Sequence, residues 1–179
     1  MEKITSDFSK NQPSGLRETA NKAISQAALE NDSLKASLAV VAYALGKILE
    51  KEHFQKETSW PRIQSSIRSE LINAVMLAKK QDFNKLKIAL LSITNRISKI
   101  DYRFGNYWQN LIEKSRVKQA SSAYALGVSL SQATQLTGCD KEELFNYIGF
   151  TKMHEETPVI KTIRERVESL SSILKGEKR

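Results

Sequence analysis

The sequence predicts an all-α fold, with a multi-helix bundle followed by two short helices and a C-terminal amphipathic helix. Apolar residues recur at spacings of three and four rather than in alternation, which is typical of helices with one buried face. The three prolines and most of the seven glycines lie where this periodicity is interrupted, so they separate the helices. No segment alternates as a half-buried strand would.

Two amphipathic helices are expected in the first 50 residues. The apolar stripe of the first consists of Leu16, Ala20, Ala23 and Ala27. The segment NDS at 31–33 offers a break and an N-terminal cap. The stripe of the second consists of Leu34, Leu38, Val41, Leu45 and Ile48. We expect residues 1–13 to be loose, as chain ends often are.

A helical hairpin is expected next, because the joint KKQD is short. Pro61 suits the first turn of its first helix, whose inner stripe consists of Ile63, Ile67, Leu71, Ala74 and Ala78. Asp82 can cap its second helix, whose stripe consists of Phe83, Leu86, Leu90, Ile93, Ile97 and Ile100. The segment AKKQDFNKLKIAL resembles the turn of a tetratricopeptide unit. No second copy follows at the required period, which favours a bundle.

The remaining chain predicts a long helix, a short helix pair and a terminal helix. The long helix follows Gly105, ends near Gly127 and carries Trp108, Leu111, Ile112, Ala123 and Leu126. Thr157 and Pro158 begin the terminal helix, whose stripe consists of Val159, Ile163, Val167, Leu170 and Leu174. We therefore place the bundle at residues 14–127, the helix pair at 128–151 and the amphipathic helix at 157–175. The last helix can fold back or pair between copies, which is one route to a homodimer.

The stretch SLSQATQLTGCDKEELFNYIG at 129–149 indicates two short helices around a glycine. Thr134, Gly138 and Leu144 occupy the small, glycine and apolar places of the helix-turn-helix family, although alanine is usual where Thr134 stands. Further core residues are Leu136, Cys139 and Ile148, and Asp140 to Glu143 is similar to a capping box. The stretch resembles this family, and it also resembles the tail of small prokaryotic proteins linked to toxin and antitoxin loci. The whole chain is similar to uncharacterised archaeal proteins.

The charge of this stretch argues against base recognition in DNA. Residues 119–157 hold two basic and five acidic residues, a net charge of −3, which would repel phosphate. Asn146 could hydrogen-bond adenine, but the aromatic Phe145 better suits a protein surface. We therefore expect the second helix to bind a protein partner through Lys141, Glu142, Phe145 and Asn146.

The positive charge of the chain lies elsewhere. Of the net +8, residues 79–118 contribute +7, with ten basic and three acidic residues. We expect a common basic face that contacts nucleic-acid phosphate through Arg96, Lys99, Arg103, Lys114, Arg116 and Lys118. Aromatic residues among them, Tyr102, Phe104, Tyr107 and Trp108, could stack on unpaired bases. Helical spacing favours a core position for Phe104 and Trp108.

The sequence offers no set of residues for catalysis, a cofactor or a metal ion. The two histidines, His53 and His154, have no second His or Cys at ligand spacing, and Cys139 is best explained as a buried thiol. DYRFGN offers Arg103 and Asn106, as in the RNA-cutting motif of the all-helical HEPN group. The histidine that this motif requires does not follow before His154.

These patterns predict a non-enzymatic, nucleic-acid-associated regulator or antitoxin-like protein. A single cysteine, no apolar leader and no long apolar run favour a reducing, cytoplasmic setting without a membrane span. A helical interaction scaffold without nucleic-acid binding is the first alternative. An RNA-processing enzyme with an unrecognised site is the second.

Overall fold

The computed structural model describes residues 1–51, 55–105, 110–154, 167–168 and 171, and every regular element in them is a helix. The helices are α1 (Glu2–Ser9), α2 (Pro13–Glu30), α3 (Ser33–Leu49), α5 (Trp60–Lys79), α6 (Phe83–Arg103), α7 (Leu111–Ala125), α8 (Leu130–Thr137) and α9 (Lys141–His154). No strand occurs in these ranges, so the predicted all-α class is confirmed.

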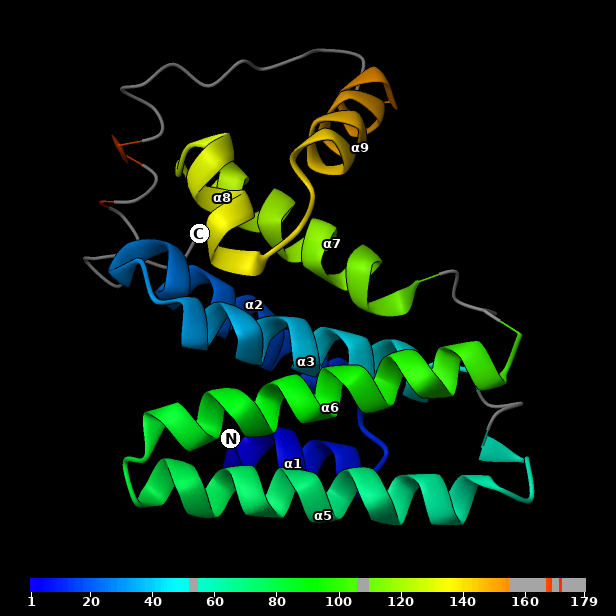
Figure 1. Cartoon of the computed structure of the whole chain (residues 1–179). Coiled ribbons are helices and arrows are strands. Elements are labelled where there is room, and N and C mark those ends of the chain that lie inside the picture. Colours follow the sequence, from blue (N-terminus) through cyan, green and yellow to red (C-terminus); the bar gives the residue numbers. More distant parts are fainter. Residues whose placement is uncertain (52–54, 106–109, 155–166, 169–170, 172–179) are drawn as a thin grey trace.

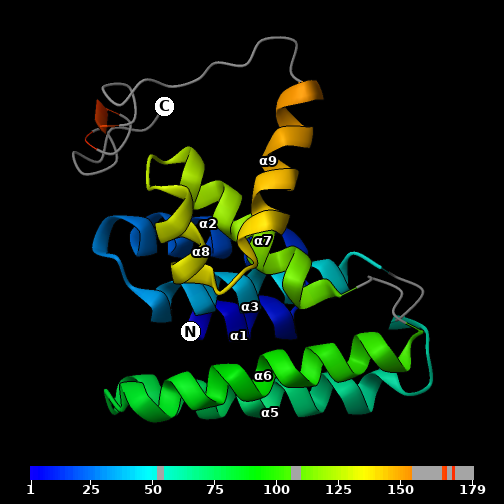
Figure 2. The ribbon, with the colours of Figure 1, turned by 45° about the horizontal axis from the view of Figure 1, so that its top comes forward.

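The helices lie in three layers (Figures 1 and 2). The antiparallel hairpin of α5 and α6 forms one outer layer, α1, α2 and α3 form the middle, and α7, α8 and α9 form the other outer layer. The middle layer therefore contacts both outer layers, with α3 packing against α6 on one side and α7 on the other. Two sets of exposed helix faces result, one on each side of the molecule.

Two apolar clusters hold the layers together. The first joins α1, α2, α3, α5, α6 and the start of α7, and its α6 members are Leu86, Leu90, Ile93, Ile97 and Ile100. The second joins the far ends of α2 and α3 to α7, α8 and α9, and its members from 128–144 are Val128, Ala133, Leu136, Cys139 and Leu144. The helix pair α8–α9 therefore shares a core cluster with the bundle. The division of the chain at residue 127 stays an interpretation of the sequence.

Side-chain caps begin the helices where the sequence predicts them. Asp32 accepts the N–H groups of Leu34 at 2.8 Å and Lys35 at 3.2 Å, which starts α3. Asp82 accepts the N–H of Lys85 at 3.1 Å, which starts α6. These carboxylates satisfy N–H groups that have no partner inside the helix.

The N-terminus departs from the expectation that residues 1–13 are loose. Residues 2–9 form α1, in which Ile4 and Phe8 are buried and belong to the first apolar cluster. Their spacing of four residues places both on one face of a helix. Two buried apolar side chains are enough to hold this short helix on the bundle.

One further expectation differs in detail, and two others fall largely outside the described residues. Phe83 was expected in the inner stripe of α6, but it is 58% exposed because it occupies the first position of the helix, beside the turn. The expected helix at 157–175 lies outside the described residues except for 167, 168 and 171, and Trp108 lies outside them altogether.

A buried carboxylate at the end of α6 connects the hairpin to α7, which belongs to the opposite outer layer. Asp101, near the end of α6, is 3% exposed, and its Oδ2 accepts the N–H of Leu111 at 2.9 Å. Leu111 is the first residue of α7, so Asp101 caps that helix from a distance in the chain. Asn110, immediately before it, adopts a left-handed conformation with φ of 66°.

Replacing Asp101 should therefore destabilise the protein. We expect Asp101→Ala to lower the free energy of unfolding by about 1–3 kcal/mol, because a buried N–H loses its acceptor. Asp101→Asn should lose less, since its amide oxygen can still accept. Urea titration followed by circular dichroism measures both, and an alanine variant as stable as the wild type would contradict this role.

Candidate functional site

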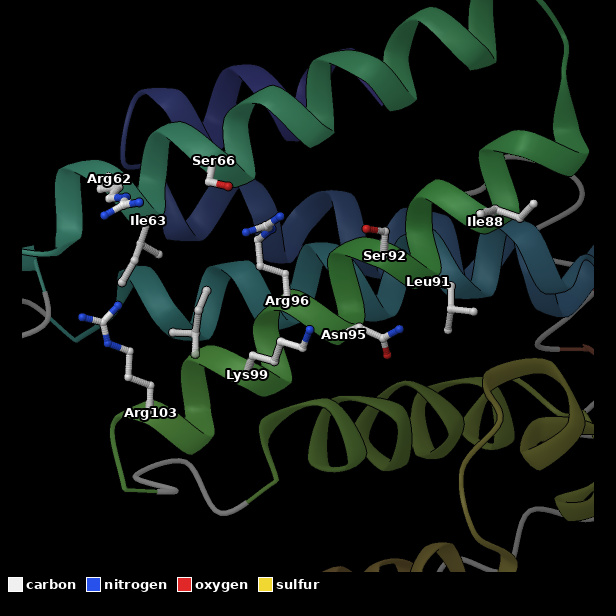
Figure 3. A pocket seen from close by; sticks show the side chains of 11 residues that line it. Arg62, Ile63, Ser66, Ile88, Leu91, Ser92, Asn95, Arg96, Lys99 and Arg103 are labelled. Carbon is white, nitrogen blue, oxygen red and sulfur yellow. The ribbon is translucent and has the colours of Figure 1, made fainter.

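A groove runs along the outer face of the α5–α6 hairpin and encloses about 770 Å³ (Figure 3). Its floor includes Ile63 and Ile100, which are 8% and 7% exposed. Arg62 and Arg103 lie at one end, and Ile88 and Leu91 lie toward the other. The groove therefore has a basic end and an apolar end.

The basic end carries more positive charge than the carboxylates of the described residues neutralise there. Arg62, Lys99 and Arg103 are exposed, and none forms an ion pair with a residue that the structure describes. Arg96, whose side chain points toward α5 in Figure 3, is paired with Glu70 of that helix. Among the described residues, one carboxylate thus accompanies four cations, and this arrangement favours an anionic ligand.

Helix packing explains why these side chains emerge together. The buried stripe of α6 faces the first apolar cluster, so residues 92, 95, 96, 99 and 103 are turned toward the groove. Arg62 comes from the start of α5, and the antiparallel hairpin brings it to the end of α6. The sequence analysis missed Arg62. The predicted hairpin could have indicated it, because residues at similar distances along the chain from the turn lie opposite each other in an antiparallel hairpin. Residues 62 and 103 stand in this relation to the turn near Gln81.

The apolar end of the groove exposes large side chains. Ile88 is 68% exposed and Leu91 is 55% exposed, and both lie on α6. Ile72 and Met76 of α5 are also exposed, at 45% and 51%, but neither lines the groove.

The structure divides the six predicted phosphate-contacting residues between two pockets and an ion pair. Arg96, Lys99 and Arg103 line the α5–α6 groove. Lys114 and Lys118 line a second pocket, between α3, α7 and α9.

The sixth residue, Arg116, pairs with Glu113 on α7, with 2.7 Å between Nη1 and Oε1. The predicted common face is therefore replaced by a groove of α5 and α6 and a separate pocket at α7.

The aromatic residues of this region also separate. Tyr102, next to Arg103, is 77% exposed. Phe104 is partly buried and packs against the first apolar cluster. Tyr107, like Trp108, lies outside the described residues. Tyr102 is therefore an exposed aromatic residue next to Arg103 in the chain, although it does not itself line the groove.

The helix pair α8–α9 surrounds a left-handed glycine. Gly138 has φ of 69° and ends α8, and Asp140 Oδ1 accepts the N–H groups of Glu142 at 2.8 Å and Glu143 at 3.0 Å. The resemblance of this pair to the helix-turn-helix family stays a prediction, and its charge argues against DNA reading.

The four predicted partner-binding residues are all exposed on α9, namely Lys141, Glu142, Phe145 and Asn146. Phe145 is 66% exposed, and Glu142 and Glu143 keep the surrounding surface acidic. This surface suits a protein partner better than phosphate.

Groups that could support catalysis or metal binding are sparse in the part of the chain that the structure describes. No cluster of three His, Cys, Asp or Glu side chains occurs there. His53 lies outside the described residues, and the side chain of His154 is not among those described. No helix in the described ranges has the length and hydropathy needed to cross a bilayer.

Comparisons with protein-family models, curated proteins and solved structures found no match to this chain.

The thiol of Cys139 should react slowly in the folded protein. It is buried in the second apolar cluster, and burial raises its pKa above the ordinary value, which keeps the nucleophilic thiolate scarce. We expect reaction with a chromogenic disulfide at pH 7 to be much slower in the folded than in the urea-unfolded protein. The folded rate should increase most above about pH 8.5, the ordinary thiol range. Equal rates at pH 7 would contradict a structural thiol.

Proposed function

We propose that this chain binds single-stranded nucleic acid along the α5–α6 groove and acts as a non-enzymatic regulator of the antitoxin-like kind. The observation that carries the proposal is the convergence of Arg62, Lys99 and Arg103 in one groove without ion-pair partners in the described chain. Cations of this kind bind successive phosphates and release the counterions condensed on the strand. Arg96 supplies a fourth donor group, held in place by Glu70.

A single strand suits this groove better than a duplex. Tyr102 is exposed beside Arg103, and an exposed aromatic ring next to phosphate-binding cations can stack on an unpaired base. Duplex reading would require a helix with basic or neutral groups facing the major groove. The exposed start of α9 instead carries Glu142 and Glu143, which phosphates would repel.

A second candidate function, protein binding, has its own observation. Phe145 is exposed on α9 among polar and acidic residues, and aromatic anchors of this kind are common at protein interfaces. In a pull-down from lysate, a protein partner of α9 should remain bound after nuclease treatment. A Phe145→Ala chain should lose it. Single-strand binding along the groove is independent of this contact.

The proposed function is tested by removing the unpaired cations of the groove. We expect the triple variant Arg62→Gln, Lys99→Gln, Arg103→Gln to bind labelled single-stranded RNA or DNA more weakly in fluorescence anisotropy. Its log affinity should also depend less steeply on log salt, by about 2, because each lost phosphate contact contributes about 0.7. Comparing the two polymers shows whether the sugar matters.

The matched control removes the same charge outside the groove. Arg68, Lys80 and Lys87 are exposed on α5, the hairpin turn and α6, and none lines the groove. Their triple replacement by glutamine should leave most of the affinity and the salt dependence intact. Equal losses in both triple variants would mean that net charge alone matters, and wild-type protein that binds neither polymer would overturn the proposal.

A further inference from the structure

A second pocket, which shares no residue with the groove, lies between α3, α7 and α9 and encloses about 580 Å³. This volume is typical of small-molecule sites. Tyr43 and Lys47 come from α3, Lys118 comes from α7, and Asn146 and Tyr147 come from α9. A molecule bound there would contact the middle layer and the helix pair at the same time.

The α3 and α7 sides of this pocket carry excess positive charge. Glu50 pairs with both Arg17 and Lys47, so one carboxylate balances two cations, with 3.1 Å between Glu50 Oε2 and Lys47 Nζ. Lys118 is half-buried and has no ion pair within the described ranges. Burial lowers the pKa of the Lys47 ammonium, and three neighbouring cations, Lys118 among them, lower it further. An anion bound near Lys47 and Lys118 would relieve this repulsion.

Two tyrosine rings lie beside these cations. The centroid of the Tyr43 ring is 5.7 Å from Lys47 Nζ, and that of the Tyr147 ring is 6.0 Å from Lys118 Nζ. Burial raises the pKa of Tyr43, and the nearby Tyr147 hydroxyl raises it further. The two phenols are therefore neighbours across the pocket, and tyrosine faces stack well on flat heterocycles.

The α9 side adds groups that can recognise the edge of such a ring. Asn146 is exposed and carries both a hydrogen-bond donor and an acceptor. The Glu143 carboxylate, which also lines the pocket, accepts hydrogen bonds and has no ion pair in the described part of the chain. Donors and acceptors next to stacking rings are the usual means by which proteins recognise an unpaired base.

We propose that this pocket binds a nucleoside monophosphate. The phosphate lies between Lys47 and Lys118, and the base stacks on the tyrosine rings with its edge toward Asn146 and Glu143. The proposal is independent of strand binding along the groove, because the two pockets draw on different residues. Its consequence is that the nucleotide joins α9 to the bundle.

Isothermal titration calorimetry of the full chain tests the proposal with AMP, GMP, CMP, UMP, their nucleosides and inorganic phosphate. We expect saturable binding of at least one nucleotide, with a dissociation constant of about 1 mM or below. The matching nucleoside and inorganic phosphate should each bind at least about tenfold more weakly, because each lacks half of the contacts. No saturable binding, or phosphate binding as tight as that of every nucleotide, would overturn the proposal.

Three single variants locate the binding. Lys118→Gln should weaken nucleotide binding about tenfold, the effect of losing a charge-assisted hydrogen bond. Asn146→Ala, at an exposed position, should weaken binding of the nucleotide but not of phosphate. Lys99→Gln, in the groove, should leave nucleotide binding unchanged. If Lys118→Gln keeps a native circular dichroism spectrum and binds as the wild type does, the pocket is not the site.

Discussion

The inward stripe of α6 decides where the charge of this molecule emerges. Leu90, Ile93 and Ile97 are at most 1% exposed and are packed against the neighbouring helices of the first apolar cluster. Burial of each such side chain contributes about 1.5–3 kcal/mol, so a rotation of α6 that exposed them would be costly. Because the stripe fixes the rotation of α6, Arg96, Lys99 and Arg103 must line the groove with α5.

The middle layer separates two places that favour anions. On one side the α5–α6 groove combines exposed cations with the exposed apolar side chains of Ile88 and Leu91, which suits a strand with a charged backbone and apolar bases. On the other side the α3–α7–α9 pocket combines lysines with tyrosine rings, which suits a small ligand. Helix α3 takes part in both, since it packs against α6 and also supplies Lys47. The two sides are also linked directly, because Asp101 of α6 accepts the N–H of Leu111, which lines the α3–α7–α9 pocket.

Periodicity in the sequence predicted most of the helices but not their neighbours in space. Spacings of three and four located α2, α3, α5 and α6, and the caps Asp32 and Asp82 followed from residue type. The short α1 was missed because its apolar face has so few residues. The separation of Lys118 from Lys99 could not be predicted, because the relative rotation of α6 and α7 depends on packing and on the link from Asp101 to Leu111.

The pair between Glu70 and Arg96 offers the most direct test of the central claim, that uncompensated positive charge in the groove binds a nucleic-acid strand. Oε2 of Glu70 is buried without a hydrogen-bond partner, and its other oxygen pairs with Arg96. Glu70→Gln preserves the shape of the side chain and removes the carboxylate that, among the described residues, accompanies the basic end. The measurement is the affinity of this variant for single-stranded RNA as a function of salt, beside Glu30→Gln, which removes the carboxylate of an ion pair with Lys35 outside both pockets. Glu70→Gln should bind the strand more tightly than the wild type, with a salt dependence steeper by about 0.7, whereas the control variant should bind as the wild type does. An unchanged or weaker affinity in a folded Glu70→Gln variant would contradict the central claim.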